Sequence, residues 1–503
     1  MNWDFYGRAE PLASLRQILA ARRWFFARIE GRRRIGKTSL LRHLANADPA
    51  LASRLVYCQI PDSDERDVAA TFQRALEDAA PTTAAQLASG VQDFPSMARA
   101  VGNLCQNGLI VVLDEFQYFS RAALRAFNSH LQAEVDRLRD LPPTDGGLFV
   151  LGSMQTEMTA LLEDDSAPLY GRLTHNLDLD HWDFSDLQAI FRDHDVRNPS
   201  QWLTLWTFFE GVPKFYHDAY GQGLYGIDPQ GFAAQLLTTL FLRGSSPLSE
   251  EADTWFLREL RGRSVSILNY LAEHPGAANG DINTALNDPR DSTPLASYLK
   301  TLTSKYRLIE RLQPVFSKEN SRNARFYVAD NFLQAWLAVV RPARNTARIR
   351  PLDQVIPMAL ARLETLEGFS FEKLIRRLHV EASRKGVGDF PLSSIQLGYW
   401  NRPREISRSI EIDLVAFDED NKRLRVGSCK RSETKHTVES LARFQQHVND
   451  FLATRDHQHL STWQIERVLF SPQFSAGARE RLEIQGYRCR DLLDYANWLA
   501  PLK

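Results

Sequence analysis

The chain has little of several features that mark whole classes of protein. Only four of its 503 residues are cysteines, and no two share the C-x-x-C spacing, so neither a zinc site nor a disulfide framework is expected. The 61 Lys and Arg residues balance the 62 Asp and Glu residues to a net charge of −1, so any nucleic-acid-binding surface must be local. Apolar runs stay short of the roughly 18 residues of a membrane span, and no signal-like segment opens the chain. These absences predict a cytoplasmic protein without a membrane partner.

Residues 31–38 follow the pattern G-x-x-x-x-G-K-T of a phosphate-binding P-loop. A strand-like apolar stretch, residues 24–30, precedes the motif, and a helical pattern begins at Ser39. In that context the backbone N–H groups curl around phosphate oxygens, Lys37 reaches the outer phosphates, and Thr38 ligates Mg²⁺. ATP and Mg²⁺ are therefore the predicted ligands. The predicted nucleotide contacts are Gly31, Arg32, Arg33, Arg34, Ile35, Gly36, Lys37, Thr38 and Ser39.

A second motif is an apolar strand, residues 108–115, that ends in Asp114 and Glu115. Asp114 is placed to hold Mg²⁺, directly or through water, and Glu115 to orient or deprotonate the attacking water. The next apolar strand ends at Ser153, which is either a sensor of the γ-phosphate or the N-cap of the following helix. Strands and helices alternate through this region, which predicts an α/β fold built on a parallel P-loop sheet.

Three further segments are similar to parts of known ATPases. The opening F-Y-G-R resembles the first segment of AAA-type and signal-transduction (STAND) ATPases, which implies that Phe5 and Arg8 lie near the adenine; a helix cap is the alternative. Arg172 lies in the region from which many oligomeric ATPases extend an arginine finger, and an ordinary surface arginine is the alternative. The segment E-G-V-P-K resembles the nucleotide-proximal motif of the STAND lid, which implies a role for Pro213, or else a helix-breaking turn.

The sequence changes character over residues 249–342. Three helical patterns precede two strand patterns joined by a polar segment, which is the winged-helix order with the third helix as recognition helix. The region is locally basic, so it either contacts DNA phosphates or serves as a structural or protein-binding module. The basic residues are Arg307, Arg311, Lys318, Arg322, Arg325, Arg341, Arg344, Arg348 and Arg350.

The last part, residues 357–503, resembles the restriction-endonuclease-like PD-(D/E)xK fold. The resemblance implies a metal site of Glu372 on a helix, Asp413 on a strand, and Ser428 and Lys430 on the next strand. Such a site needs two or three carboxylates around Mg²⁺, and Ser428 stands where an acid is expected. We therefore interpret the site as degenerate, with Glu411, on the same strand face as Asp413, as a possible substitute ligand.

The motifs G-R-R-R-I-G-K-T-S-L, V-V-L-D-E-F-Q and E-I-D-L-V-A together resemble the archaeal-type P-loop ATPase family. The resemblance implies a multidomain α/β chain: ATPase core 1–180, helical lid 181–248, winged helix 249–342, linker 343–356 and nuclease-like domain 357–503. It favours an ATP-hydrolysing switch coupled to a DNA-binding, nuclease-like domain. The alternatives are an ATP-gated Mg²⁺-dependent endonuclease, and an ATP-dependent homo-oligomeric scaffold that recruits a protein partner.

Overall fold

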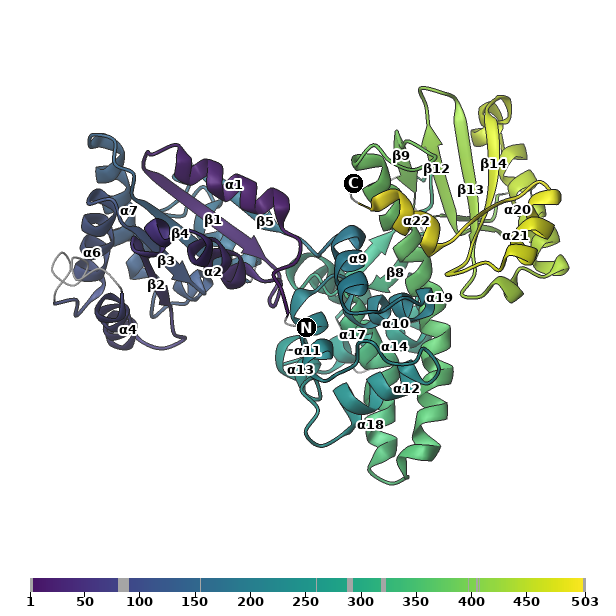
Figure 1. Ribbon diagram of the computed structural model, residues 1–503, viewed down its shortest axis with the longest axis horizontal. Helices are drawn as coiled ribbons and strands as arrows, with labels where there is room; N and C mark the ends of the chain where they lie inside the picture. The colour runs from purple at the N-terminus through teal and green to yellow at the C-terminus, as the bar shows by residue number, and fades with distance from the viewer. Residues whose placement is uncertain are drawn as a thin grey trace. The chain divides into compact units, whose positions relative to one another are not determined.

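The computed structural model describes residues 3–79, 90–153, 155–258, 260–286, 293–317, 323–396, 398–403, 406 and 408–500. The chain divides into two compact units (Figure 1). The N-terminal unit consists of Asp4–Trp182 together with the short segment Val212–Lys214. The C-terminal unit consists of Met1–Trp3, Asp183–Gly211 and Phe215–Lys503. The lid motif expected around Pro213 is thus divided between the two units.

The N-terminal unit is built on a five-stranded sheet in the order β2-β3-β4-β1-β5, and every neighbouring pair is parallel. Its strands are β1 (Phe25–Gly31), β2 (Leu55–Gln59), β3 (Ile110–Asp114), β4 (Gly147–Gly152) and β5 (His175–Leu179). β3 and β4 are completely buried, as expected for central strands covered on both faces. Because the strands are parallel, the segments that follow β1, β3 and β4 meet at one edge.

Helices cover both faces of this sheet. Alternate residues of a strand point to opposite faces, so Val111 packs in one core cluster and Val112 in the other. The first cluster includes side chains of α4, α6 and α7, and the second includes side chains of α1 and α2. The helices are α1 (Ala9–Ala20), α2 (Lys37–Ala47), α3 (Pro49–Ala52), α4 (Glu65–Asp78), α6 (Phe94–Gln106), η1 (Phe116–Ser120), α7 (Ala126–Asp140) and α8 (Gln155–Leu162).

The C-terminal unit begins with helices and a small antiparallel sheet. The helices are α9 (Phe184–Asp193), α10 (Pro199–Phe209), α11 (Pro213–Gly221), α12 (Phe232–Leu237), η2 (Thr238–Leu242), α13 (Glu251–Trp255), α14 (Arg263–Glu273), α15 (Asn279–Ala285), α16 (Leu295–Lys300) and η3 (Thr301–Lys305). The sheet has the order β6-β8-β7, from β6 (Ala277–Ala278), β7 (Ile309–Leu312) and β8 (Arg325–Val328). The three helices and two longer strands expected within 249–342 are therefore present, while Lys318 and Arg322 lie outside the described residues.

The segment expected as a linker, residues 343–356, is helical except at residues 348–351. After α17 (Asn331–Ala335) and η4 (Trp336–Val340), α18 spans Arg341–Ala347 and the 33-residue α19 spans Leu352–Arg384 (Figure 1). Two prolines beside this segment occupy positions that are compatible with helices. Pro342 lies in the first turn of α18, and Pro351 is the N-cap of α19.

The rest of the C-terminal unit is a mixed five-stranded sheet in the order β15-β14-β13-β12-β9, with a separate β10–β11 pair. β12 and β13 form an antiparallel hairpin, whereas β13, β14 and β15 are parallel. The strands are β9 (Ser394–Gln396), β10 (Tyr399–Asn401), β11 (Ile410–Ile412), β12 (Leu414–Asp418), β13 (Arg423–Cys429), β14 (Gln464–Phe470) and β15 (Arg488–Arg490). The helices are η5 (Glu433–Lys435), α20 (Val438–Ala453), η6 (Arg455–Thr462), α21 (Ala476–Ile484) and α22 (Leu492–Leu499).

The multidomain α/β fold class is confirmed: the described residues form the parallel sheet that carries the phosphate loop, and three further sheets. Within the described ranges, no helix combines the length and the apolar character needed to cross a membrane.

Candidate nucleotide site

The phosphate loop connects β1 to the N-terminus of α2, where three residues have positive φ. The values are 155° at Gly31, 66° at Arg34 and 93° at Gly36. A Cβ atom on Gly31 would lie 2.5 Å from the backbone oxygen of Leu179, so the close approach of β5 requires glycine there. The loop therefore has the tight backbone course that its sequence predicted.

Lys37 is the first residue of α2, and its side chain folds back over the loop. Its Nζ donates to the backbone oxygens of Gly31, at 2.9 Å, and Arg32, at 3.2 Å. Burial lowers the pKa of Lys37 to about 8, although the Asp114 and Glu115 carboxylates oppose that shift. A cation held inside a loop of this shape is suited to bind phosphate oxygens.

The carboxylate of Asp114, at the end of β3, joins the loop to two strands. Its Oδ2 accepts from Thr38 Oγ1 and from Tyr57 OH, both at 2.7 Å, and its Oδ1 accepts from the backbone N–H of Glu115 at 2.8 Å. The two residues predicted to hold Mg²⁺, Thr38 and Asp114, are thus in direct contact. Burial, followed by the hydrogen bond to Asp114, raises the pKa of Tyr57, so this hydroxyl is a donor at neutral pH.

The carboxylate of Glu115 lies in a second polar cluster beside the first. The Nε2 of Gln117, a buried side chain on η1, donates to Glu115 Oε2 and lies 3.4 Å from Ser153 Oγ. Ser153 Oγ lies 3.4 Å from the same Glu115 oxygen, and the Ser153 backbone N–H donates to Gln117 Oε1 at 3.3 Å. The insertion of β4 between β1 and β3 brings Ser153 to this place. Ser153 thus contacts the predicted base, and its role as a sensor of the γ-phosphate stays a prediction.

Other predicted contacts surround the loop. Arg8 donates to the backbone oxygens of Ile35, at 2.8 Å, and Asp180, at 2.6 Å. Arg32 Nη1 lies 3.0 Å from His181 Nε2. Pro213 Cγ is 4.0 Å from the position that a Cβ on Gly36 would occupy.

The remaining predicted residues differ in exposure and surroundings. The Phe5 ring stacks on His43 of α2, with centroids 3.9 Å apart. Ile35 is buried in the core, whereas Arg33 and Ser39 are exposed. Ile35 can therefore contribute only its backbone to a bound phosphate.

The described hydrogen bonds of Arg172 connect it to α7 and not to the loop. Its guanidinium pairs with both oxygens of Asp136, at 2.8 and 2.7 Å. That hydrogen bonding lowers the pKa of Asp136 and raises the pKa of Arg172. An arginine finger would have to break this bidentate pair, so its role as a finger remains a prediction.

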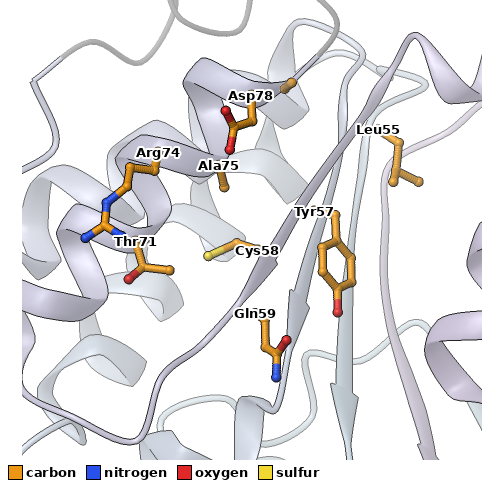
Figure 2. A pocket seen from close by; sticks show the side chains of 9 residues that line it. Leu55, Tyr57, Cys58, Gln59, Thr71, Arg74, Ala75 and Asp78 are labelled. Carbon is orange, nitrogen blue, oxygen red and sulfur yellow. The ribbon is translucent and has the colours of Figure 1, made fainter.

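A pocket of about 450 Å³ lies beside the edge strand β2 and α4, but it contains no P-loop residue (Figure 2). Cys58 and Thr71 lie in the space between β2 and α4, while the Tyr57 ring points away from α4 (Figure 2). We therefore locate the site by the contacts of Lys37 and Asp114 and not by cavity size. Tyr57 itself escaped prediction, because no local pattern marks a strand residue that reaches the neighbouring strand's carboxylate.

In the C-terminal unit, the residues of the predicted nuclease-like site lie close together. Asp413, between β11 and β12, accepts from the backbone N–H of Cys429 at 2.8 Å and lies 3.4 Å from Ser428 Oγ. Lys430 Nζ is 3.6 Å from the same carboxylate. Burial raises the pKa of Glu372, on α19, to about 8, and the charge of Asp413 adds to the shift. The site therefore has one carboxylate that favours protonation and a serine in place of an acid.

Glu411, the possible substitute for the missing acid, is paired with another element. Its carboxylate is exposed and pairs with Arg325 of β8 at 2.7 Å. Over the described residues, no group of three or more Asp, Glu, His or Cys side chains is arranged to hold a metal ion. The degenerate character of this site stays a prediction.

Comparison with known proteins gives a family model that matches part of the chain and an archaeal protein that matches most of it. Residues 336–441 match the family DUF234, described as "Archaea bacterial proteins of unknown function". The protein MJECL04 of Methanocaldococcus jannaschii is 25% identical over 426 residues, which is 83% of this chain and 85% of that protein.

Two solved structures are similar to this chain at low identity. The Walker-type ATPase PABY2304 of Pyrococcus abyssi aligns with a TM-score of 0.48 and 17% identity, over 67% of this chain and 97% of that one. The ORC2 protein of Aeropyrum pernix aligns with a TM-score of 0.46 and 15% identity, over 71% of this chain and 96% of that one. The predicted resemblance to archaeal-type proteins is confirmed by the DUF234 match and by the similarity to the M. jannaschii protein.

Proposed function

We propose that the chain is an ATP-hydrolysing molecular switch whose N-terminal unit binds ATP with Mg²⁺. One observation carries the proposal: Lys37, Thr38, Asp114 and Glu115 meet at one edge of a parallel sheet, at the N-terminus of α2. Helix N-termini and inward N–H groups favour phosphate there. The residues present fit the group, because a hydroxyl and a carboxylate 2.7 Å apart are hard oxygen ligands for Mg²⁺.

Each residue then has a definite task. Thr38 and Asp114 would hold Mg²⁺, which when bound neutralises phosphate charge. Lys37 binds the outer phosphate oxygens, for which it exchanges its bonds to the Gly31 and Arg32 carbonyls. Glu115 accepts a proton from the attacking water, and Ser153 contacts both Glu115 and Gln117.

We propose further that residues 249–342 form a winged helix and that residues 357–503 form a restriction-endonuclease-like domain that binds DNA without cutting it. The order of three helices and an antiparallel hairpin supports the first assignment. The antiparallel β12–β13 hairpin with Asp413 and Lys430 supports the second. Ser428 and the pairing of Glu411 with Arg325 favour loss of cleavage. The boundaries of the lid, 181–248, belong to the same proposal.

ATP hydrolysis by the full chain is the test of the switch. We expect Mg²⁺-dependent hydrolysis that Lys37→Ala abolishes, whereas Lys435→Ala, an exposed lysine of η5, leaves it unchanged. Undiminished hydrolysis by Lys37→Ala would reject the proposed site.

A second experiment separates the DNA-related alternatives. The protein is mixed with plasmid and linear DNA, with Mg²⁺ or Mn²⁺, with and without ATP. We expect intact DNA and a binding affinity that falls steeply with salt. Cleavage that disappears in Asp413→Ala would establish the ATP-gated endonuclease, whereas absent or salt-independent binding would favour the oligomeric scaffold.

A further inference from the structure

We propose that Glu210, Lys373 and Arg377 are positioning residues for the segment that leads into Val212–Lys214, and that they make helix α19 responsive to nucleotide. The inference rests on the proposed ATP binding and goes beyond it, because it assigns the path by which the C-terminal unit detects the nucleotide.

Glu210 has a backbone conformation that is rare for a residue with a side chain. It follows the last turn of α10 with φ 52° and ψ −113°, outside the usual regions. Its backbone oxygen accepts from Tyr216 OH at 2.6 Å, and its side chain is only 1% exposed. Such conformations persist only where the surroundings enforce them, and they gather at functional and switch segments.

Two cations of α19 supply that enforcement. The carboxylate Oε1 of Glu210 lies 3.1 Å from Lys373 Nζ and 2.7 Å from Arg377 Nη2. The spacing of four residues places both cations on one side of the helix. Lys373 also donates to the backbone oxygen of Ala329, at 2.8 Å, and to Asn331 Oδ1, at 3.0 Å, so its position is fixed. Removal of one partner leaves a buried charge uncompensated, which strongly destabilises the folded protein.

The chain passes directly from this anchor to the phosphate loop. Gly211 separates Glu210 from Val212–Lys214, which belongs to the N-terminal unit and places Pro213 beside Gly36. Gly36 precedes Lys37, so phosphate bound in the loop acts on the neighbourhood of Pro213. Any displacement of Pro213 must be taken up within the two residues that join it to Glu210.

Helix α19 also contacts the chain next to the nuclease-like site. Glu367 of α19 accepts a hydrogen bond from Arg431 Nε at 2.6 Å, and Arg431 directly follows Lys430. Helix α19 thus contacts Glu210 at one place and Arg431 at another. A rigid helix with two such contacts can transmit a change at one of them to the other. The C-terminal domain thereby acquires a mechanical connection to the nucleotide.

Hydrogen–deuterium exchange of the full chain, with and without the analogue AMP-PNP and Mg²⁺, tests the inference. In the natural protein we expect the analogue to change exchange in peptides of 364–384 and 410–430 by roughly fivefold or more, the scale of ordinary allosteric coupling. The variants Glu210→Gln and Lys373→Met/Arg377→Met should still bind AMP-PNP but lose this change. Arg377→Lys, which keeps the charge, and Arg362→Met, a comparably exposed arginine of α19, should retain it.

The outcomes separate this inference from the proposed function. No binding of AMP-PNP to the natural protein would reject ATP binding itself. Binding without altered exchange in α19, or an undiminished change in Glu210→Gln, would overturn the inference and leave the ATPase intact. If Glu210→Gln fails to fold, the Lys373→Met/Arg377→Met variant still tests the inference, because it removes the same ion pairs from the side of α19.

Discussion

The carboxylate of Asp114 gives the sharpest test of the site's construction. Its two oxygens accept three hydrogen bonds, from Thr38, Tyr57 and the Glu115 backbone. Asp114→Asn keeps the shape but removes the charge and turns an amide NH₂ toward at least one donor. A hydrogen bond to a charged group contributes about 1.5–3 kcal/mol, so we expect β3 to lose about 2 kcal/mol of local stability. Loss of a Mg²⁺ ligand should lower kcat by about 100-fold or more, since metal stabilisation of the transition state is worth several kcal/mol.

The matched control is Tyr57→Phe, which removes one donor to the same oxygen but no metal ligand. It should cost about 1 kcal/mol and change kcat by less than about threefold, because a hydrogen bond contributes modestly to stability. Native-state hydrogen exchange of the β3 amides measures the first quantity, and Mg²⁺ titration of steady-state hydrolysis measures the second. The assignment of Asp114 as a Mg²⁺ ligand would be refuted if both variants lost the same factor in kcat, or if Asp114→Asn kept the kcat of the natural protein.

Three other predictions follow from the same structure. Because the pKa of Lys37 is about 8 and bound phosphate must raise it, ATP binding takes up a proton above pH 8, and Kd should rise by up to about tenfold per pH unit. Calorimetry in buffers of different ionisation enthalpy measures that uptake; a pH-independent Kd contradicts it. Gly31→Ala places a Cβ atom 2.5 Å from the backbone oxygen of Leu179, at a residue with φ 155°. We expect the variant to lose ATP binding, measured by calorimetry, and about 1–3 kcal/mol of stability, measured by hydrogen exchange of the β1 amides. Burial would raise the pKa of Asp389, but its pairing with Arg425 lowers it to about 2. This pairing contributes about 2 kcal/mol to the stability of the folded protein above pH 4, and the contribution is lost as the pH falls through 2. Asp389→Asn should therefore flatten the acid dependence of the melting temperature, and an unchanged dependence would contradict the pairing.

The P-loop and the strands around it were predictable because their information is local. The motif lies within some 20 residues: a buried strand comes first, then a glycine with positive φ, then a helix. The strand ending in Asp114 and Glu115 was predictable for the same reason. Strand order was not, because pairing of β4 between β1 and β3 depends on the whole sheet.

Consequently, the contacts of the site were only partly foreseen. Ser153 was singled out as a strand-end polar residue, but its connection to Glu115 through Gln117 depends on the position of β4. Tyr57 reaches Asp114 because β2 lies beside β3, which no spacing in the sequence reveals.

In the C-terminal part, local patterns gave the elements but not their limits. Asp413 and Glu411 were expected on one strand, yet the structure has β11 and β12 separated at Asp413, since β11 pairs with β10 and β12 with β13 and β9. The helix expected to carry Glu372 is the 33-residue α19. Tertiary packing decided both limits.

The most direct measurement of the central claim is ATP binding and Mg²⁺-dependent phosphate release by the full chain beside Lys37→Ala. We predict that the natural chain binds and hydrolyses ATP and that Lys37→Ala does neither. Hydrogen exchange should show that β1 and α2 of this variant remain folded. Hydrolysis by the folded Lys37→Ala protein, or no ATP binding by the natural chain, would contradict the nucleotide site described here.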